Sequence, residues 1–124
     1  MKAEELRIGN YVSTIYPKFN YEKVKEIKEK VVYTDNIKGI GYISLKPIPL
    51  TEEIVCNIKD IIKKNENTYI LPNGLHIEFL FPEPTLRKPT SSETSIFLCD
   101  VEYLHELQNA YYWLSDKKEL NIKL

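Results

Sequence analysis

The sequence has little arginine, little glycine and no excess of charge of either sign. Only two of its 124 residues are arginines and four are glycines, and 17 lysines and arginines stand against 18 aspartates and glutamates, a net charge of -1. Proteins that coat nucleic acids or anionic membranes carry a clear positive excess, and arginine is the side chain that forks onto phosphate and guanine. Any polyanion-binding site must therefore be a local patch.

Long apolar runs and abundant cysteine are also missing. No apolar stretch approaches the length that spans a bilayer, and the N-terminus lacks the apolar core of a secretory signal. The two cysteines, Cys56 and Cys99, sit in apolar sequence, which favours two small, buried, reduced side chains over a disulfide or a reactive thiol. With 43% hydrophobic residues, the chain is expected to be a soluble, cytoplasmic protein with a single domain over residues 1–124.

Motifs for metal, cofactor or nucleophile chemistry are lacking as well. The soft ligands His76, His105, Cys56 and Cys99 show none of the short paired spacing of a zinc site. There is no G-x-S-x-G elbow, and the G-x-G at residues 39–41 lacks a third glycine. We therefore expect no catalytic residues, no metal, no cofactor and no enzyme activity.

The first half, residues 1–50, reads as β-rich. β-branched and aromatic residues predict strands over 10–16, 31–34 and 42–45. Residues 21–30 fit either a helix or a bulged strand, and the neighbouring strands favour a strand. This half is expected to form a curved antiparallel sheet or an SH3-like small barrel.

The second half, residues 51–124, mixes helices and strands, which makes the fold class α+β. Thr51 predicts the cap of an amphipathic helix over 51–64. A hairpin over 68–71 and 75–81 turns at Pro72-Asn73-Gly74. The remaining expectations are an exposed, mobile loop over 82–95, a strand over 95–99, a final aromatic helix from about Asp100 to Ser115, and a short edge strand over 120–124.

Three blocks of the sequence, in this order, resemble a family of short uncharacterised proteins from anaerobic gut bacteria, their phages and their mobile elements. The blocks are LRIGNYV at 6–12, KPIPLTEEI at 46–54 and LHELQNAYY at 104–112. The family pattern reads roughly R-I-G-N-Y-V, P-I-P-L-T-E-E-I-L and H-x-L-Q-N-x-Y-x-x-L. The resemblance spans most of the chain, although the segment 82–95 is longer here. It implies a barrel-like first half followed by helices packed on strands, and it implies no activity or cofactor.

The final helix carries the clearest hint of a binding surface. His105 shares a face with polar residues at helical spacing, which is either a recognition face or a tie to neighbouring backbone. Three aromatic residues in a row, at 111–113, point about 100° apart, so at least one should look outward. Tryptophan and tyrosine are typical interface anchors. The candidate interface residues are Tyr103, His105, Gln108, Asn109, Tyr112 and Trp113.

A second surface is a weaker candidate for nucleic acid. The lysines between residues 18 and 30 are interleaved with glutamates, which favours an ordinary solvated surface over a binding stripe. Tyrosines at 11, 16, 21 and 33 are either core residues or stacking platforms for bases. The candidate contacts are Lys23, Lys25, Lys28, Arg87 and Lys88.

These patterns favour a non-catalytic accessory or adaptor protein of a phage or mobile element, acting in the cytoplasm of a bacterial host cell through contact with a protein partner or with itself. The alternative is a small nucleic-acid-binding module with weak affinity. A third hypothesis is a phage protein that binds a host nucleotide signal, or a small enzyme. No membrane or metal partner is expected.

Overall fold

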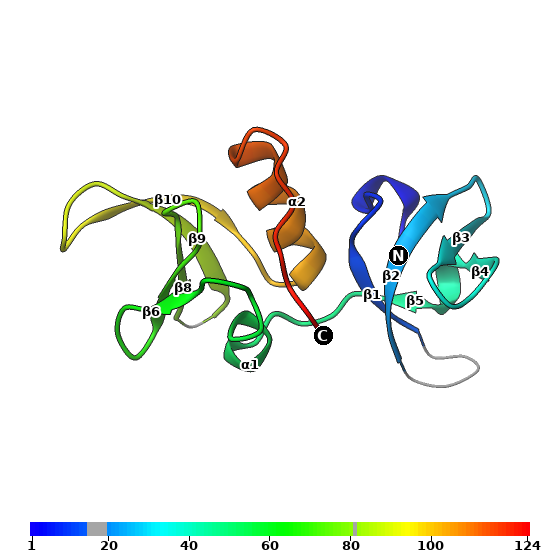
Figure 1. Cartoon of the computed structure of the whole chain (residues 1–124), viewed down its shortest axis with the longest axis horizontal. Helices are drawn as coiled ribbons and strands as arrows, with labels where there is room; N and C mark the ends of the chain where they lie inside the picture. Colours follow the sequence, from blue (N-terminus) through cyan, green and yellow to red (C-terminus); the bar gives the residue numbers. More distant parts are fainter. Residues whose placement is uncertain (15–19, 81) are drawn as a thin grey trace. The chain divides into compact units, whose positions relative to one another are not determined.

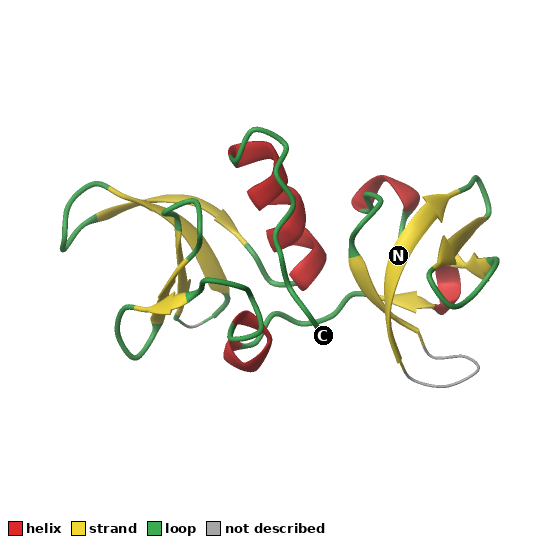
Figure 2. Cartoon of the chain, viewed as in Figure 1, coloured by secondary structure: helices red, strands yellow, loops and turns green. Residues whose placement is uncertain are grey.

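The computed structural model describes residues 1–14, 20–80 and 82–124 as an α+β protein built mainly from antiparallel strands (Figures 1 and 2). The chain divides into two compact units. Unit 1 contains residues 1–49 and 103–119, and unit 2 contains residues 50–102 and 120–124. Unit 1 is therefore discontinuous in sequence, because its last helix follows the whole of the unit 2 sheet.

Unit 1 contains a five-stranded antiparallel sheet in the order β4-β3-β2-β1-β5. The strands are β1 (Tyr11–Thr14), β2 (Asn20–Ile27), β3 (Val31–Thr34), β4 (Ile40–Gly41) and β5 (Leu45–Lys46). Short 3-10 turns lie at Ala3–Glu5 (η1) and at Tyr42–Ser44 (η2). Among the described strands, β4 and β5 lie at opposite edges, so their ladder does not close the sheet. The predicted strand over 21–30 is confirmed by β2, whereas the predicted strand over 42–45 is wrong because η2 occupies most of it.

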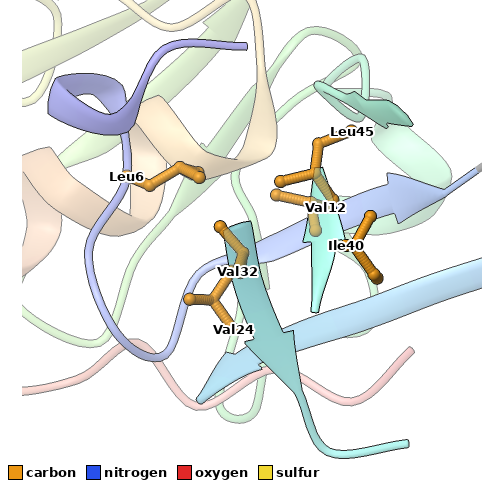
Figure 3. Packing of buried hydrophobic residues seen from close by; sticks show 6 residues of the cluster. All are labelled: Leu6, Val12, Val24, Val32, Ile40 and Leu45. Atoms are coloured by element: carbon orange, nitrogen blue, oxygen red, sulfur yellow. The ribbon is translucent and has the colours of Figure 1, made fainter. Parts of the chain in front are cut away.

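One face of this sheet packs into a hydrophobic core. Six side chains, one from the N-terminal segment and one from each of the five strands, point toward one another, as Figure 3 shows. They are Leu6, Val12, Val24, Val32, Ile40 and Leu45. Side chains alternate between the two faces of a strand, so the residues beside Val12 and Val24 in sequence lie on the opposite face. The end of the predicted strand over 10–16 falls on residues 15 and 16, outside the described residues, as does Tyr16.

Unit 2 contains a five-stranded antiparallel meander in the order β10-β9-β8-β7-β6. Its elements are α1 (Glu52–Val55), β6 (Ile62–Lys63), β7 (Thr68–Ile70), β8 (His76–Phe79), β9 (Pro84–Pro89) and β10 (Ser95–Asp100). Tyr69, Ile77 and Leu86 are direct cross-strand neighbours and are all buried, so they form the centre of its core face. The predicted hairpin is confirmed by β7 and β8, although Phe81 lies outside the described residues.

The predicted helix over 51–64 is wrong beyond its first turn. Thr51 does cap the helix by accepting a hydrogen bond from the Ile54 N–H, but α1 ends at Val55. Asp60 has a φ of 64°, in the left-handed region that a right-handed helix cannot use. The apolar residues that suggested a longer helix make β-type pairings instead. Ile58 forms a β-bridge with Ile122 of the C-terminal tail, and Ile62 in β6 pairs with Ile70 in β7. The tail therefore contributes one bridge rather than an edge strand.

Two further boundaries differ from expectation. The segment 82–95 is not one long loop, because β9 occupies 84–89 and only residues 90–94 connect it to β10. Two of the three prolines in this segment, Pro84 and Pro89, stand at the ends of β9, where strands tolerate them. The final helix, α2 (Leu104–Leu114), starts later than Asp100, which is the last residue of β10. Glu106 accepts a hydrogen bond from the Tyr103 N–H and so caps its first turn.

Two isoleucines test the corrected structure of residues 56–63. Ile58 is 3% exposed and Ile62 is 59% exposed, although a helix over 51–64 would bury both. We expect Ile58→Ala to lower the free energy of unfolding by about 2–5 kcal/mol through lost burial and a cavity. Ile62→Ala should change it by less than about 0.5 kcal/mol. Denaturant unfolding measures both, and equal losses would show that the residues share a buried helix face.

Candidate functional site

Helix α2 is joined to the start of β1 through the side-chain amide of Gln108. The Tyr11 N–H donates to Gln108 Oε1 at 2.8 Å, and Gln108 Nε2 donates to the Gly9 carbonyl at 3.1 Å. Gln108 is only 2% exposed. A side-chain amide has one acceptor and one donor side, like a peptide group. Gln108 therefore bonds to this backbone as a neighbouring strand would.

The place of these bonds explains why an amide is needed there. On the β2 side, the Gly9 N–H donates to the Val24 carbonyl, and the Val24 N–H donates to Asn10. On the other side of β1, β5 pairs only with Ser13 and Thr14. Buried backbone polar groups need partners, and Gln108 supplies them beyond the point where β5 ends. Gly9 has a positive φ of 99°, and with this backbone conformation its N–H bonds to β2 while its carbonyl accepts from Gln108 on the other side.

Asn109 extends this contact to the N-terminal segment. Its Oδ1 accepts hydrogen bonds from Arg7 Nε at 3.2 Å and from Asn10 Nδ2 at 2.8 Å, while its Nδ2 donates to the Glu5 carbonyl at 3.2 Å. We call Gln108 and Asn109, with the backbone and side chains they bond, the amide clamp. Of the two interpretations of the polar helix face, this geometry corresponds to a tie between the helix and neighbouring backbone for these two residues.

His105 lies on the same helix and is 4% exposed. Its ring stacks on Tyr103, with ring centres 6.0 Å apart, and its Nδ1 is buried with no hydrogen-bond partner among the described residues. Burial lowers the pKa of His105 below its usual value near 6.5, and the nearby carboxylates of Glu106 and Glu5 offset only part of that effect. Burial in the folded chain therefore favours the neutral form of this ring.

The aromatic side chains at the end of α2 differ sharply in exposure. Tyr111 is buried, Tyr112 is half-buried and Trp113 is 65% exposed. The Trp113 ring meets Tyr112 edge to face at 5.1 Å, and the Arg7 guanidinium lies 3.9 Å from the centre of the Tyr112 ring. The helical spacing of Leu104, Leu107, Tyr111 and Leu114 predicts one buried stripe, but Leu114 is exposed. Trp113 is thus the ring that looks outward.

Arg7 makes two further contacts within unit 1. It forms a two-pronged salt bridge with the Glu119 carboxylate, and its Nη1 also donates to the carbonyl of Ile8. Ile8 is 57% exposed. We call Arg7, Ile8, Tyr112 and Trp113 the Trp113 patch. Sequence reasoning singled out Tyr112 and Trp113 but missed Arg7 and Ile8, because nothing local in the sequence places residues 7 and 112 together.

The candidate nucleic-acid contacts do not form one group. Lys23, Lys25 and Lys28 lie in or beside β2 of unit 1, whereas Arg87 and Lys88 lie in β9 of unit 2. Arg87 is already engaged, since its Nε donates to Ser95 Oγ at 2.7 Å and lies 3.9 Å from a Glu78 carboxylate oxygen.

Strand β2 also separates some of its lysines from a glutamate, which the interpretation of this segment as a solvated surface of mixed charge missed. Lys23 and Lys25 are exposed, while Glu22 between Tyr21 and Lys23 is buried. Glu22 accepts hydrogen bonds from Asn20, Thr34 and Asn36. Alternation along the strand therefore separates the lysines from this glutamate, and a period of two in the sequence was the signal for it.

Other site chemistry is sparse in the part of the chain that is described. Within these residues no group of three His, Cys, Asp or Glu side chains is placed to hold a metal ion. Cys56 is exposed and Cys99 half-buried, so the expectation of two buried cysteines is wrong. The longest described helix, α2, has 11 residues, and none in the described ranges has the length and apolarity to cross a membrane.

Comparisons of the chain with protein-family models, curated proteins and solved structures gave no match in any of the three.

The amide clamp predicts a specific stability loss. Gln108→Leu keeps the approximate volume of the side chain and removes both of its hydrogen bonds to residues 9 and 11. We expect the free energy of unfolding to fall by about 1–3 kcal/mol, because backbone groups at a partly buried site lose their partners. Denaturant unfolding measures the loss. A change below about 0.5 kcal/mol would mean that the amide is dispensable.

The buried imidazole predicts a pH dependence. As the pH falls through about 6.5, the unfolded chain protonates His105 more readily than the folded chain does, because the folded-state pKa is lowered. Stability should therefore decrease from pH 7.5 to pH 5.5. His76, whose pKa burial also lowers, contributes in the same direction. We expect His105→Leu to lose less stability over this interval than the wild type, and an unchanged pH dependence would contradict this assignment.

Proposed function

We propose that this chain is a non-catalytic accessory or adaptor protein that binds a partner protein through the Trp113 patch. The observation that carries the proposal is the exposed Trp113 ring, packed edge to face on Tyr112 with Arg7 stacked on the same tyrosine. The origin in a phage or mobile element, and work in the cytoplasm of a bacterial host, rest on the family resemblance of the sequence.

The composition of the patch supports this proposal. Tryptophan, tyrosine and arginine are the residues that most often carry the binding energy of protein interfaces. The exposed Trp113 ring, together with the exposed side chain of Ile8, which follows Arg7 in the chain, offers surface that water solvates poorly. The partner we expect presents an apolar depression that receives the Trp113 ring.

The patch is also held in place before any partner arrives. Arg7 is fixed by Glu119, by Asn109 and by the face of Tyr112. Ordering long side chains on binding costs about 0.5–1.5 kcal/mol for each. A guanidinium that is already positioned avoids that cost, so this arrangement favours a specific interface over non-specific hydrophobic association.

We infer further that unit 1 is built as an SH3-like small barrel that carries this interface. The strand order β4-β3-β2-β1-β5 supports the inference, as does the 3-10 turn η2 between β4 and β5. The long strand β2, which pairs with β1 along one part and with β3 past a bulge at Lys25, is the bent strand that such a barrel needs. Small barrels of this kind serve many unrelated binding functions.

The test has two stages. Tagged wild-type protein is purified from its native host, and its partner is identified by mass spectrometry. The affinity of that partner for Trp113→Ala and for Ile43→Ala is then measured. Ile43, in η2, is 87% exposed and is the matched control for an exposed apolar residue outside the patch. Sedimentation of all three proteins reports self-association.

We expect Trp113→Ala to weaken partner binding, or self-association if the partner is a second copy, by about 2 kcal/mol or more. Ile43→Ala should leave the affinity unchanged, and both variants should keep the melting temperature of the wild type within a few degrees. If Ile43→Ala abolishes binding while Trp113→Ala retains it, the interface lies elsewhere and the proposal fails.

A further inference from the structure

We propose that the outer face of β5, β1 and β2 in unit 1 binds single-stranded nucleic acid, a function separate from the Trp113 patch. Five exposed or partly exposed side chains define this face, Tyr11, Tyr21, Lys23, Lys25 and Lys46, and they surround Ser13, which is buried. They include three lysines and two tyrosines, and no carboxylate. We call this set the lysine–tyrosine face.

The pairing register brings these residues to one side of the sheet. Tyr11 stands opposite Lys23, and Ser13 stands between Tyr21 on β2 and Lys46 on β5. Residues two apart on a strand point to the same face. Lys25 follows Lys23 by two residues, at the bulge, and is exposed. Sequence positions 11 to 46 thus converge on one surface.

The same alternation removes acidic side chains from this surface. Glu22 lies between Tyr21 and Lys23 in sequence, but its carboxylate is buried on the opposite face and accepts a hydrogen bond from Thr34 Oγ1 at 2.7 Å. Glu26 lies beyond the bulge, where Lys28 sits 3.7 Å from its carboxylate. Within β1, β2 and β5 the face therefore carries lysines and no carboxylate, while the exposed Asp35 adjoins it, since the Asp35 N–H donates to the Lys23 carbonyl at 3.2 Å.

Unit 1 as a whole carries the net positive charge that such a site requires. It carries eleven lysines and arginines against nine aspartates and glutamates, whereas unit 2 carries six against nine. The near-neutral total charge of the chain conceals this difference. A positive unit with a local cluster of lysines attracts a phosphate backbone even though the whole protein does not.

The two tyrosines supply surfaces on which bases stack. Tyr21 is 40% exposed, Tyr11 is partly exposed, and Lys23 lies over the Tyr11 ring at 5.9 Å from its centre. Diagonal neighbours on adjacent strands have Cα atoms about 7–8 Å apart. Two successive unpaired bases can span that separation, and the flanking lysines lie where their phosphates would run.

The chemistry favours single strands over duplexes. Tyrosine faces stack only on bases that are not already paired and stacked. Neither of the two arginines belongs to this face, since Arg7 pairs with Glu119 and Arg87 lies in unit 2. The forked contacts that read guanine in the major groove are therefore missing from it. Three lysines allow about three phosphate contacts, which predicts a slope of about -2 for the logarithm of affinity against the logarithm of salt concentration.

Fluorescence anisotropy of a labelled 20-nucleotide oligothymidylate, titrated with the full chain between 25 and 200 mM salt, tests the proposal. An unlabelled DNA duplex of equal length is the competitor. The charge variant is Lys23→Gln with Lys25→Gln. Its matched control, Lys59→Gln with Lys123→Gln, removes the same charge from exposed lysines of unit 2. Tyr21→Leu removes the ring, and Tyr21→Phe keeps it.

We expect micromolar binding at the lowest salt, a slope near -2, and preference for the single strand. The charge variant should reduce the slope to about -0.7, while its control leaves it unchanged. Tyr21→Leu should weaken binding at least fivefold, and Tyr21→Phe should restore it. Equal losses in the charge variant and its control, preference for the duplex, no binding at 25 mM salt, or a slope much steeper than -2 would each overturn the assignment.

Discussion

The side-chain amide of Gln108, bonded to the backbone of Gly9 and Tyr11, is the contact on which the rest of unit 1 depends. It satisfies polar groups of β1 where β5 no longer reaches, and it comes from a helix about 100 residues later in the chain. Because this contact fixes the rotation of α2, Leu104, Leu107 and Tyr111 face the interior and Trp113 faces outward. The proposed interface is thus a consequence of a structural hydrogen bond.

One face of helix α2 therefore has a structural role, and the other is the surface of the proposed interface. The polarity of Gln108 and Asn109 suggested a recognition face, but their side-chain amides form hydrogen bonds within the chain. The surface that we propose for a partner centres on the ring of Trp113, which packs on Tyr112 and through it on Arg7. Fixing Arg7 through Asn109 joins the two roles, since the same network that holds the N-terminal segment also orders the patch.

Local signals predicted the elements whose determinants are local. The β7–β8 hairpin follows from its turn residues, and the Thr51 cap follows from its position before two glutamates. The helix over 51–64 failed because Ile58 and Ile62 satisfy a helical period equally well, and only their pairing with Ile122 and Ile70 decides against it. The prediction of a loop over 82–95 failed because two of its prolines, Pro84 and Pro89, fall at strand ends.

Of the site, Trp113 could be foreseen from helical geometry, whereas Arg7 could not, since no local rule relates residues 7 and 112. The sorting of Lys23 from Glu22 was readable from strand alternation once β2 was accepted as a strand.

Hydrogen exchange at the Tyr11 amide reports directly on the bond between helix α2 and β1, because that N–H donates to the Gln108 side chain. The Val24 amide, which donates to the Asn10 carbonyl within the sheet, is the internal reference. We predict that Tyr11 exchanges slowly in the wild type and that Gln108→Leu accelerates Tyr11 exchange much more than Val24 exchange. Rapid exchange of Tyr11 in the wild type, or equal acceleration at both amides, would contradict this prediction.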